Sequence, residues 1–451
     1  MRRIETAACN PEELRLLLQR TALDEVQVSE AVARRTEAIF GARLSPEEAV
    51  RRIIADVEAH GDAAVADYAE RIDGVKLAPE QFFVDGEELE RAKSSVEPEA
   101  LQAIRTACRR VRLYHEAQLE RSWWIEGPHG EILGQRVQPL ERVACYVPGG
   151  RARLLSSAVM TVVPAKVAGV AEVIVATPCR PDGTVDPYVL VAAVEAGADR
   201  ILKVGGAQAI AALAYGTTWI PKVDKIVGPG NIFVTLAKKQ VFGRVGIDGL
   251  AGPSEVVVVA DDSADPAWVA ADLLSQAEHD PEAVAMLLAA GAEVADRALV
   301  EVERQLEHMD RREVAREALE RWGVAVVCRD VDEALELVNV IAPEHLELLV
   351  RDPWAALGKV RHAGAVFLGP WSTVPLGDFI AGPNHVLPTN GTARFASPLG
   401  VYDFVNRVSV VAMTERAAQA VGEEAKKLAF LEGLPGHAGA IDRRLSAGRG
   451  D

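Results

Sequence analysis

The sequence predicts an α/β fold of two tandem Rossmann-like, doubly wound parallel-sheet domains, with helical N-terminal and C-terminal segments. The chain has 451 residues, which is more than one ordinary domain. Ala, Val, Leu and Gly dominate and only 5% of residues are aromatic, a mix typical of parallel sheets buried between helices. From about residue 143, short β-branched runs alternate with Ala-rich stretches, which is the pattern of βαβ units.

The expected elements follow from hydrophobic periodicity. Residues 11–120 are charge-rich and place apolar residues such as Val50, Ile53 and Val57 at helical spacing, so we expect mostly helices there. A first βα series has expected strands at 173–176, 201–204 and 225–227, and expected helices at 188–196, 208–215 and 231–239. A second series has a helix ending at residue 279 and expected strands at 255–259, 283–288, 324–328 and 364–368. After about residue 395 the chain becomes helical and polar again.

Composition excludes several classes of protein. A net charge of −17 argues against nucleic-acid binding, which needs basic patches that neutralise phosphates. The longest apolar tract, 157–178, is interrupted by Pro164, Lys166 and Glu172, so we expect no membrane span. The beginning of the chain lacks the apolar core of a signal peptide, and we expect a soluble, cytoplasmic protein. The five cysteines are scattered, so we expect neither a disulfide framework nor a thiolate zinc site.

Glycine-rich turns follow three of the expected strands, at 146–150, 204–208 and 227–231. Each turn places backbone N–H groups near a helix start, where a phosphate or another anion can bind. None of them spells GxGxxG, and each alone is more often an ordinary tight turn. Together, with Tyr146, Gln208 and Asn231 beside them, they favour a nucleotide-sized ligand.

Gln276 and His279 are three residues apart at the end of an apolar helical pattern. Positions i and i+3 share a helix face, so the two side chains can converge on one metal ion. Asp378 and His437 are candidates for the remaining ligands, and His385 in the Gly/Pro-rich loop 382–388 is a rival. The alternative for the tail motif around His437 is a simple helix end.

Glu344 and His345 stand side by side after Pro343. On an extended or turning segment both can reach one pocket, where one activates water and the other moves a proton. The alternative is a surface dipeptide, and the absence of HExxH speaks against a zincin-type protease. Ser254, before the strand that opens the second series, is a candidate substrate contact or only part of a turn.

With these motifs in order, the chain resembles the histidinol dehydrogenase family from about residue 30 to 443. The resemblance rests on YVPGG (146–150), VGGAQAIAALAYGT (204–217), KVDKIVGPGN (222–231), AGPSE (251–255), LLSQAEHDP (273–281), APEHLE (342–347), AGPNHVLPT (381–389), GTARFASPL (391–399) and EGLPGH (432–437). The chain departs from the family pattern at 151–155, 249–250, 371–376 and Phe379. None of these departures removes a candidate ligand or the Glu–His pair.

The resemblance implies a role for each candidate residue. One Zn²⁺ per subunit would be bound by Gln276, His279, Asp378 and His437, and the last of these would come from the partner in a homodimer with shared active sites. Glu344 and His345 would be the catalytic acid/base pair. NAD would contact Tyr146, Gln208 and Asn231. Substrate would contact the metal ligands and also Ser254, His345 and Glu432.

The implied reaction is oxidation of L-histidinol to L-histidine through a bound L-histidinaldehyde, with reduction of two NAD, the last step of histidine biosynthesis. His345 would take the alcohol proton, and Glu344 would activate water for attack on the aldehyde. A paralogue that oxidises another amino or sulfonated alcohol is the alternative within the family. A zinc hydrolase without NAD and a silent binding protein are further alternatives. Cys145 is a candidate nucleophile for the second step, but its neighbours predict a buried strand, where a thiol is usually inert.

The expected domains are an N-terminal helical segment, two Rossmann-like domains and a tail. Residues 1–30 form the segment, and residues 31–140 plus 253–390 form the domain with the zinc and catalytic residues. Residues 141–252 form the NAD-contacting domain. Residues 391–451 form a helical tail that contributes to the dimer and to the partner's active site.

Overall fold

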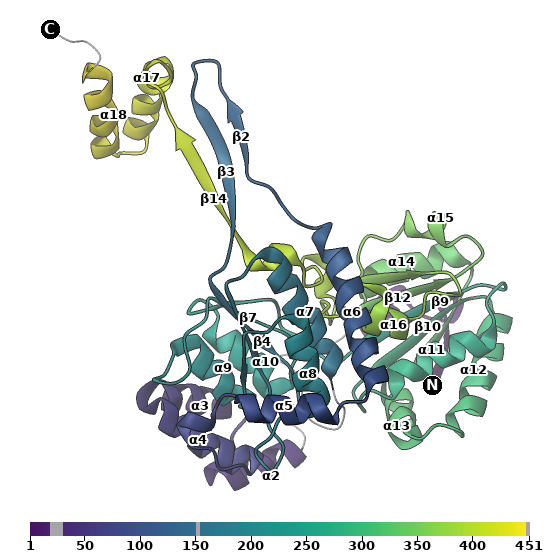
Figure 1. Ribbon diagram of the computed structural model, residues 1–451. Coiled ribbons are helices and arrows are strands. Elements are labelled where there is room, and N and C mark those ends of the chain that lie inside the picture. Colours follow the sequence, from purple (N-terminus) through teal and green to yellow (C-terminus); the bar gives the residue numbers. More distant parts are fainter. Residues whose placement is uncertain (19–29, 150–153, 448–451) are drawn as a thin grey trace. The chain divides into compact units, whose positions relative to one another are not determined.

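The computed structural model describes residues 1–18, 30–149 and 154–447. The chain divides into two units: unit 1 is Met1–Gln118 with Glu141–Phe404, and unit 2 is Leu119–Leu140 with Val405–Asp451. Among the described residues, unit 1 contains two parallel sheets and unit 2 a three-stranded antiparallel sheet with two helices (Figure 1). The two helix-covered parallel sheets confirm the expected fold class. Residues 150–153 and the last four residues lie outside the described residues. The first of these ranges contains Gly150, the end of the first glycine turn, and residues 151–153, where the sequence departs from the family pattern.

The six-stranded sheet of unit 1 has the strand order β1-β11-β10-β9-β12-β13, with all neighbours parallel. Its strands are β1 (Arg2–Glu5), β9 (Glu255–Ala260), β10 (Val284–Ala290), β11 (Val324–Cys328), β12 (His345–Leu349) and β13 (Ala365–Leu368). Val256 and Val258 face a core with α11 (Pro266–Ala277), α12 (Ala292–Leu306) and α13 (Arg312–Trp322). Val257 and Val259 face the opposite core with α1 (Pro11–Leu18), α14 (Val331–Ile341) and α15 (Pro353–Leu357). The alternation follows from the two-residue period of a strand, and it explains why β9 is apolar throughout.

The five-stranded sheet of unit 1 has the order β6-β5-β4-β7-β8, again parallel. Its strands are β4 (Arg142–Tyr146), β5 (Glu172–Ala176), β6 (Arg200–Leu202), β7 (Lys225–Val227) and β8 (Gly246–Ile247). The connecting helices are α7 (Leu155–Ala168), α8 (Pro187–Ala196), α9 (Gly206–Tyr215) and α10 (Ile232–Val241). The expected strands and helices of this series are therefore present, with ends shifted by at most two residues.

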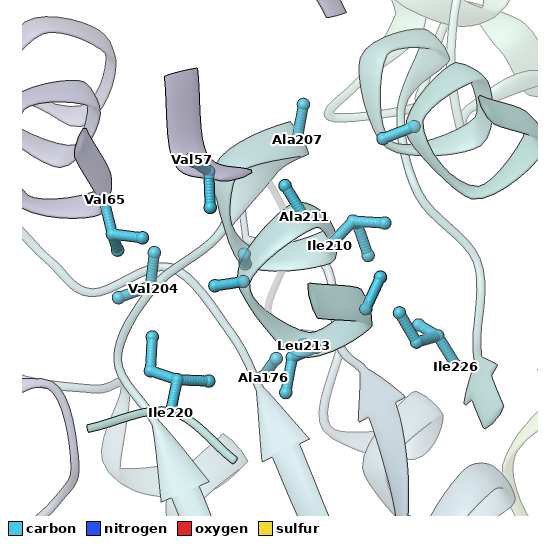
Figure 2. Close-up of a cluster of buried hydrophobic side chains, with 14 of the residues drawn as sticks. Val57, Val65, Ala176, Val204, Ala207, Ile210, Ala211, Leu213, Ile220 and Ile226 are labelled. Atoms are coloured by element: carbon cyan, nitrogen blue, oxygen red, sulfur yellow. The ribbon is translucent and has the colours of Figure 1, made fainter. Parts of the chain in front are cut away.

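The Ala-rich helix α9 lies at the centre of a buried cluster on this sheet. Figure 2 shows Ala207, Ile210 and Leu213 of α9 together with Val57 and Val65. The last two come from α3 (Pro46–His60) and α4 (Asp62–Tyr68), which therefore pack on the five-stranded sheet. This packing differs from the expected grouping of 31–140 with 253–390. The helical spacing that identified α3 carries no information on which sheet its apolar face covers.

Three further helices precede this sheet in the chain: α2 (Glu30–Phe40), α5 (Gly86–Ser95) and α6 (Pro98–Glu116). Helix α6 packs against α7 and α8 and also contacts the π-helical turn η5 (Gly377–Ala381). Of the helices in the described part of the chain, none has the length and apolar character needed to cross a membrane.

The two ends of the chain contain strands that the sequence did not predict. Residues 2–5 form β1, which pairs with β11 and places Ile4 in the core. The helical prediction for 1–30 is therefore wrong at this point, because four residues are too few to show a period. In the tail, β14 (Val405–Ala412) pairs antiparallel with β3 (Ile132–Pro139). The helical tail predicted for 391–451 is present at 415–431 and 435–447, but it also contains this strand, and the Val-rich run 408–411 is the signal that the prediction overlooked.

Unit 2 is a sheet in the order β14-β3-β2 followed by α17 (Glu415–Leu431) and α18 (Pro435–Ala447). Every residue of β2 (Trp123–Glu126) is exposed. Other large apolar side chains of this unit are also exposed, including Val411 (68%) and Leu431 (76%). An exposed apolar surface of this kind is typical of a protein–protein interface.

Candidate active site

The Glu–His pair lies at the amino edge of the six-stranded sheet. Helix α14 ends at Ile341, Ala342 takes a left-handed φ of 53°, and Pro343 prevents the helix from continuing. The chain then turns into β12, whose first residue is His345. Strand β9 is the parallel neighbour of β12 and begins at Glu255, so Glu255 and Glu344 lie together at this edge.

Helix α11 brings Gln276 to the same edge. The helix connects the carboxyl end of β9 to the amino end of the parallel strand β10, so its last turn returns to the amino side. Gln276 lies in that turn and is buried, and its Nε2 has no hydrogen-bond partner. The helix ends at Ala277, so His279 lies in the turn beyond it rather than on the helix as predicted. The backbone N–H of His279 still donates to the carbonyl of Gln276 at 3.2 Å, which keeps the two residues adjacent.

Glu255, Glu344 and His345 form a buried hydrogen-bonded array. The backbone N–H of Glu255 donates to Glu344 Oε2 at 2.9 Å, and that of Glu344 donates to Glu255 Oε1 at 3.1 Å. His345 Nδ1 lies 3.0 Å from the carbonyl oxygen of Glu255. A carbonyl can only accept, so Nδ1 carries a proton and the neutral ring has its lone pair on Nε2. In the neutral ring this buried Nε2, which has no hydrogen-bond partner, can accept a proton from a ligand.

Asp378 reaches this edge by a return segment, residues 369–381, which follows the carboxyl end of β13. It includes α16 (Val374–Leu376) and the turn η5. Asp378 Oδ1 lies 3.6 Å from His345 Nε2. Gly377 is required just before it, because a Cβ there would lie 2.4 Å from the ring of Phe367. That ring packs against the imidazole of His345 with centroids 6.1 Å apart.

The surroundings of Glu344 and His345 raise the pKa of both side chains, so both hold their protons at neutral pH. Burial raises the pKa of Glu344 to about 8. Burial alone would lower the pKa of His345, but the charges of Glu344 and Asp378 outweigh it and raise the pKa to about 9. Burial alone would raise the pKa of Asp378, but the neighbouring His345, His385 and His279 reverse the shift and lower it. Asp378 is therefore an ionised carboxylate surrounded by imidazoles.

His385 belongs to the same cluster. Its Nδ1 donates to the carbonyl oxygen of Asp378 at 2.9 Å, and its Nε2 lies 3.5 Å from Ser157 Oγ. Burial lowers the pKa of His385, so the ring is neutral at physiological pH. The sequence identified His385 only as a rival ligand, and it gave Ser157 no role.

The donors at this edge fit a zinc ion. His279 Nδ1 donates to the carbonyl of Ser275 at 2.9 Å, which leaves Nε2 for a metal, as in most metal-bound histidines. The amide of Gln276, whose Nε2 has no hydrogen-bond partner, can present its oxygen after a half-turn about its last side-chain torsion angle, and Asp378 supplies a carboxylate. Nitrogen and carboxylate oxygen are ligands that zinc accepts. Within the described ranges, no three His, Cys, Asp or Glu side chains form a complete metal cluster.

The other predicted site residues are placed as follows. Ser254 directly precedes β9, is half-buried, and accepts a hydrogen bond at its carbonyl from Val284 N–H. Glu432 is the C-terminal capping residue of α17, and His437 lies in the first turn of α18. Both are exposed and belong to unit 2. Their part in the site of unit 1 stays a prediction.

A separate cavity of about 560 Å³ lies at the carboxyl edge of the five-stranded sheet. Tyr146, Gln208 and Asn231 all line it, together with Gly149 and Gly206 from the glycine turns. Tyr146 Oη accepts from the N–H of Gly206 at 3.0 Å. This edge is where doubly wound folds usually bind nucleotides.

Gln208 and Asn231 have local partners as well. Gln208 Nε2 donates to Asp73 Oδ2 at 3.2 Å, while its buried Oε1 has no partner. Asn231 caps α10 through Oδ1, which accepts from Phe233 N–H at 3.1 Å. The unpartnered Oε1 of Gln208 is thus the clearest polar group left for a ligand. Asp73 is a cavity residue that the sequence did not single out.

Cys145 lies within β4 and is fully buried. Burial raises the pKa of its thiol to about 12, so the thiolate is not populated at neutral pH. The strand expected around it is present, and the thiol has the environment of an inert core residue.

Comparisons with known sequences and with solved structures lead to one family. The histidinol dehydrogenase family model matches residues 42–445. The chain is 53% identical over 413 residues to the histidinol dehydrogenase of Moorella thermoacetica, covering 92% of this chain and 97% of that protein. It is 52% identical over 400 residues to that of Geobacillus kaustophilus, covering 89% and 94%. The crystal structure of histidinol dehydrogenase from Elizabethkingia anophelis matches with a TM-score of 0.91 at 33% identity, covering 100% of this chain and 99% of that chain.

Proposed function

Because the chain belongs to the histidinol dehydrogenase family, we propose that it oxidises L-histidinol to L-histidine through a bound L-histidinaldehyde, with reduction of two NAD. The observation that carries the proposal is the array of Glu255, Glu344 and His345 next to Asp378. It provides a proton acceptor with a fixed tautomer beside a carboxylic acid whose pKa lies in the working range.

His345 in its neutral form accepts the proton of the substrate alcohol at Nε2, the ring atom without a hydrogen-bond partner. Because the charges of Glu344 and Asp378 raise the pKa of His345 to about 9, this neutral form becomes more populated as pH rises. Its Nδ1–H stays on the carbonyl of Glu255, so the imidazole keeps its orientation while it is protonated. Glu344, once ionised, takes a proton from the water that adds to the aldehyde. Its buried position keeps bulk water away, so hydration occurs only where this carboxylate directs it.

Zinc would be held by Gln276, His279 and Asp378 of one subunit and by His437 of the partner subunit. When bound, the zinc ion would act as a Lewis acid and would orient histidinol through its imidazole and amino nitrogens. Asp378 is kept ionised by its imidazole neighbours and is therefore ready to bind a cation. Ser254 and Glu432 contact the substrate, together with His345.

NAD would occupy the cavity lined by Tyr146, Gln208 and Asn231, and it supplies the hydride acceptor. The unpartnered Gln208 Oε1 accepts from a ligand donor there. A homodimer is supported by the exposed apolar side chains of unit 2, such as Trp124 and Val411. The cytoplasmic location stays a prediction.

The decisive experiment measures NADH formed per molecule of L-histidinol by purified protein, with chelator and with added zinc. Two NADH per histidinol, abolished by chelation and restored by zinc, are expected. A fully metallated protein that forms no NADH from histidinol, but forms it from another amino or sulfonated alcohol, would instead be a paralogue. If chelation leaves NADH formation unchanged, the proposed requirement for zinc is contradicted.

A further inference from the structure

Two acidic side chains meet behind the active site, on elements that carry three of its residues. Glu347 is two residues after His345 on β12, so both face the same side of the sheet. Leu346 and Leu348 face the opposite core, which places Glu347 on the side covered by α11. Asp272 lies on α11 one turn before Gln276, on the same helix face.

The contacts of this pair connect three segments of chain. Asp272 and Glu347 lie close enough to interact, since each of them binds one of two adjacent residues. Glu347 Oε1 accepts from the backbone N–H of Val374 at 2.8 Å, and Asp272 Oδ1 accepts from the hydroxyl of Thr373 at 2.7 Å. Thr373 and Val374 belong to the return segment that leads to Asp378. Strand β12, helix α11 and the return segment therefore join at these two carboxyl groups.

The surroundings of the two acids favour a proton on Glu347. Glu347 is fully buried, and its Oε2 has no donor among the groups around it. Two ionised carboxylates can only accept, so they would repel each other where one of them is fully buried. Asp272 from α11 and His345 from the strand itself are the titratable groups that act on Glu347, while Thr373 and Val374 are uncharged. Burial and Asp272 raise the pKa of Glu347 to about 9, so the acid is protonated at neutral pH.

We propose that Asp272 and Glu347 share one proton and act as a positioning pair, which holds the return segment and α11 against β12. In this arrangement Glu347 donates from Oε2 to Asp272 and accepts from Val374. The pair touches neither substrate nor cofactor. It acts through His345, Gln276 and Asp378, whose functions rest on the proposed histidinol oxidation.

Two variants of similar size separate a hydrogen-bonding role from simple filling of the core. Glu347→Gln keeps both a donor for Asp272 and an acceptor for Val374, so kcat should stay within about threefold of wild type. Glu347→Leu removes both hydrogen bonds, so kcat should fall by about tenfold or more, since small displacements of catalytic groups cost that much. KM for NAD should not change in either variant, because the NAD cavity lies on the other sheet. Full activity in Glu347→Leu, or equal loss in both variants, would overturn the proposal.

An infrared measurement tests the shared proton without using catalysis. The spectrum of wild type minus Glu347→Gln at pH 7.5 should contain the carbonyl band of a protonated carboxylic acid. Glu344→Gln serves as the control, because Glu344 contributes a separate band of the same kind. Absence of the Glu347 band would refute the shared proton even if histidinol is oxidised. Its presence in a protein inactive on histidinol would support the pair while refuting the proposed function.

Discussion

Glu255 and Glu344 hold each other by reciprocal hydrogen bonds, in which the backbone N–H of each residue donates to the carboxylate of the other. The exchange joins the first residue of β9 to the residue just before β12. It fixes the Glu344 carboxyl next to His345, whose Nδ1 uses the carbonyl of the same Glu255. Glu255, for which the sequence predicted no role, therefore orients both Glu344 and His345.

Glu255→Gln should lower the pKa at which Glu344 acts, because the negative charge of Glu255 raises it. The pH profile of aldehyde oxidation should shift to lower pH, with little loss of maximal rate, since the amide oxygen can still accept. An unchanged profile would contradict the electrostatic coupling between Glu255 and Glu344.

Glu255→Ala leaves the N–H groups of Glu344 and Asn390 without their acceptor. The free energy of unfolding should fall by about 2–4 kcal/mol in a denaturant titration.

Aldehyde oxidation should accelerate with pH. Burial raises the pKa of Glu344 to about 8, so the group is mostly protonated at pH 7 and becomes ionised, and active as a base, as pH rises through 8. The rate from L-histidinaldehyde should therefore rise roughly tenfold between pH 7 and 9. Glu344→Gln should flatten this profile and damage the aldehyde step more than the alcohol step. An equal loss in both steps would argue against the division of labour between Glu344 and His345.

His279→Ala should lose zinc and activity together. The matched control is His308→Ala, because His308 is also exposed and its Nδ1 also bonds the carbonyl four residues earlier, Arg304 O at 3.0 Å. Metal content by atomic absorption should fall in the first variant and stay at one zinc per subunit in the second. Retention of full zinc by His279→Ala would refute its role as a ligand.

Gly377→Ala should impair catalysis through packing alone. The added Cβ would lie 2.4 Å from the Phe367 ring, so the ring or the turn that carries Asp378 must move. We expect kcat to fall by about tenfold, with KM for NAD unchanged. Gly86→Ala is the control, since a Cβ there meets nothing within 4 Å. Normal kcat in Gly377→Ala would show that the turn tolerates the displacement.

Cys145→Ser should retain most activity in both steps. The thiol is fully buried in β4 and its pKa is raised to about 12, so it does not act as a nucleophile. Steady-state rates with histidinol and with the aldehyde provide the test. Selective collapse of the aldehyde rate would assign the second step to this cysteine.

The sequence predicted the fold class and the central strands because their apolar runs are long and bounded by glycine turns. It missed β1 and β14, where pairing with a distant strand, rather than local periodicity, decides the conformation. It identified Glu344 and His345 as a pair because they are adjacent. Glu255 and Glu347 received no role because their partners lie 89 and 27 residues away, and only the strand order brings these groups together.

A main-chain oxygen accepts the hydrogen bond from His345, and this determines how mutation can change the site. Residue 255 provides that oxygen whatever its side chain is, so the pairing of β9 with β12 fixes the tautomer of the imidazole. Of the acid/base pair, the side chain at 255 forms its hydrogen bond with Glu344, while it also accepts from the N–H of Asn390. Natural drift or design at this one position can therefore retune the acid that activates water, while the base that takes the alcohol proton stays as it is.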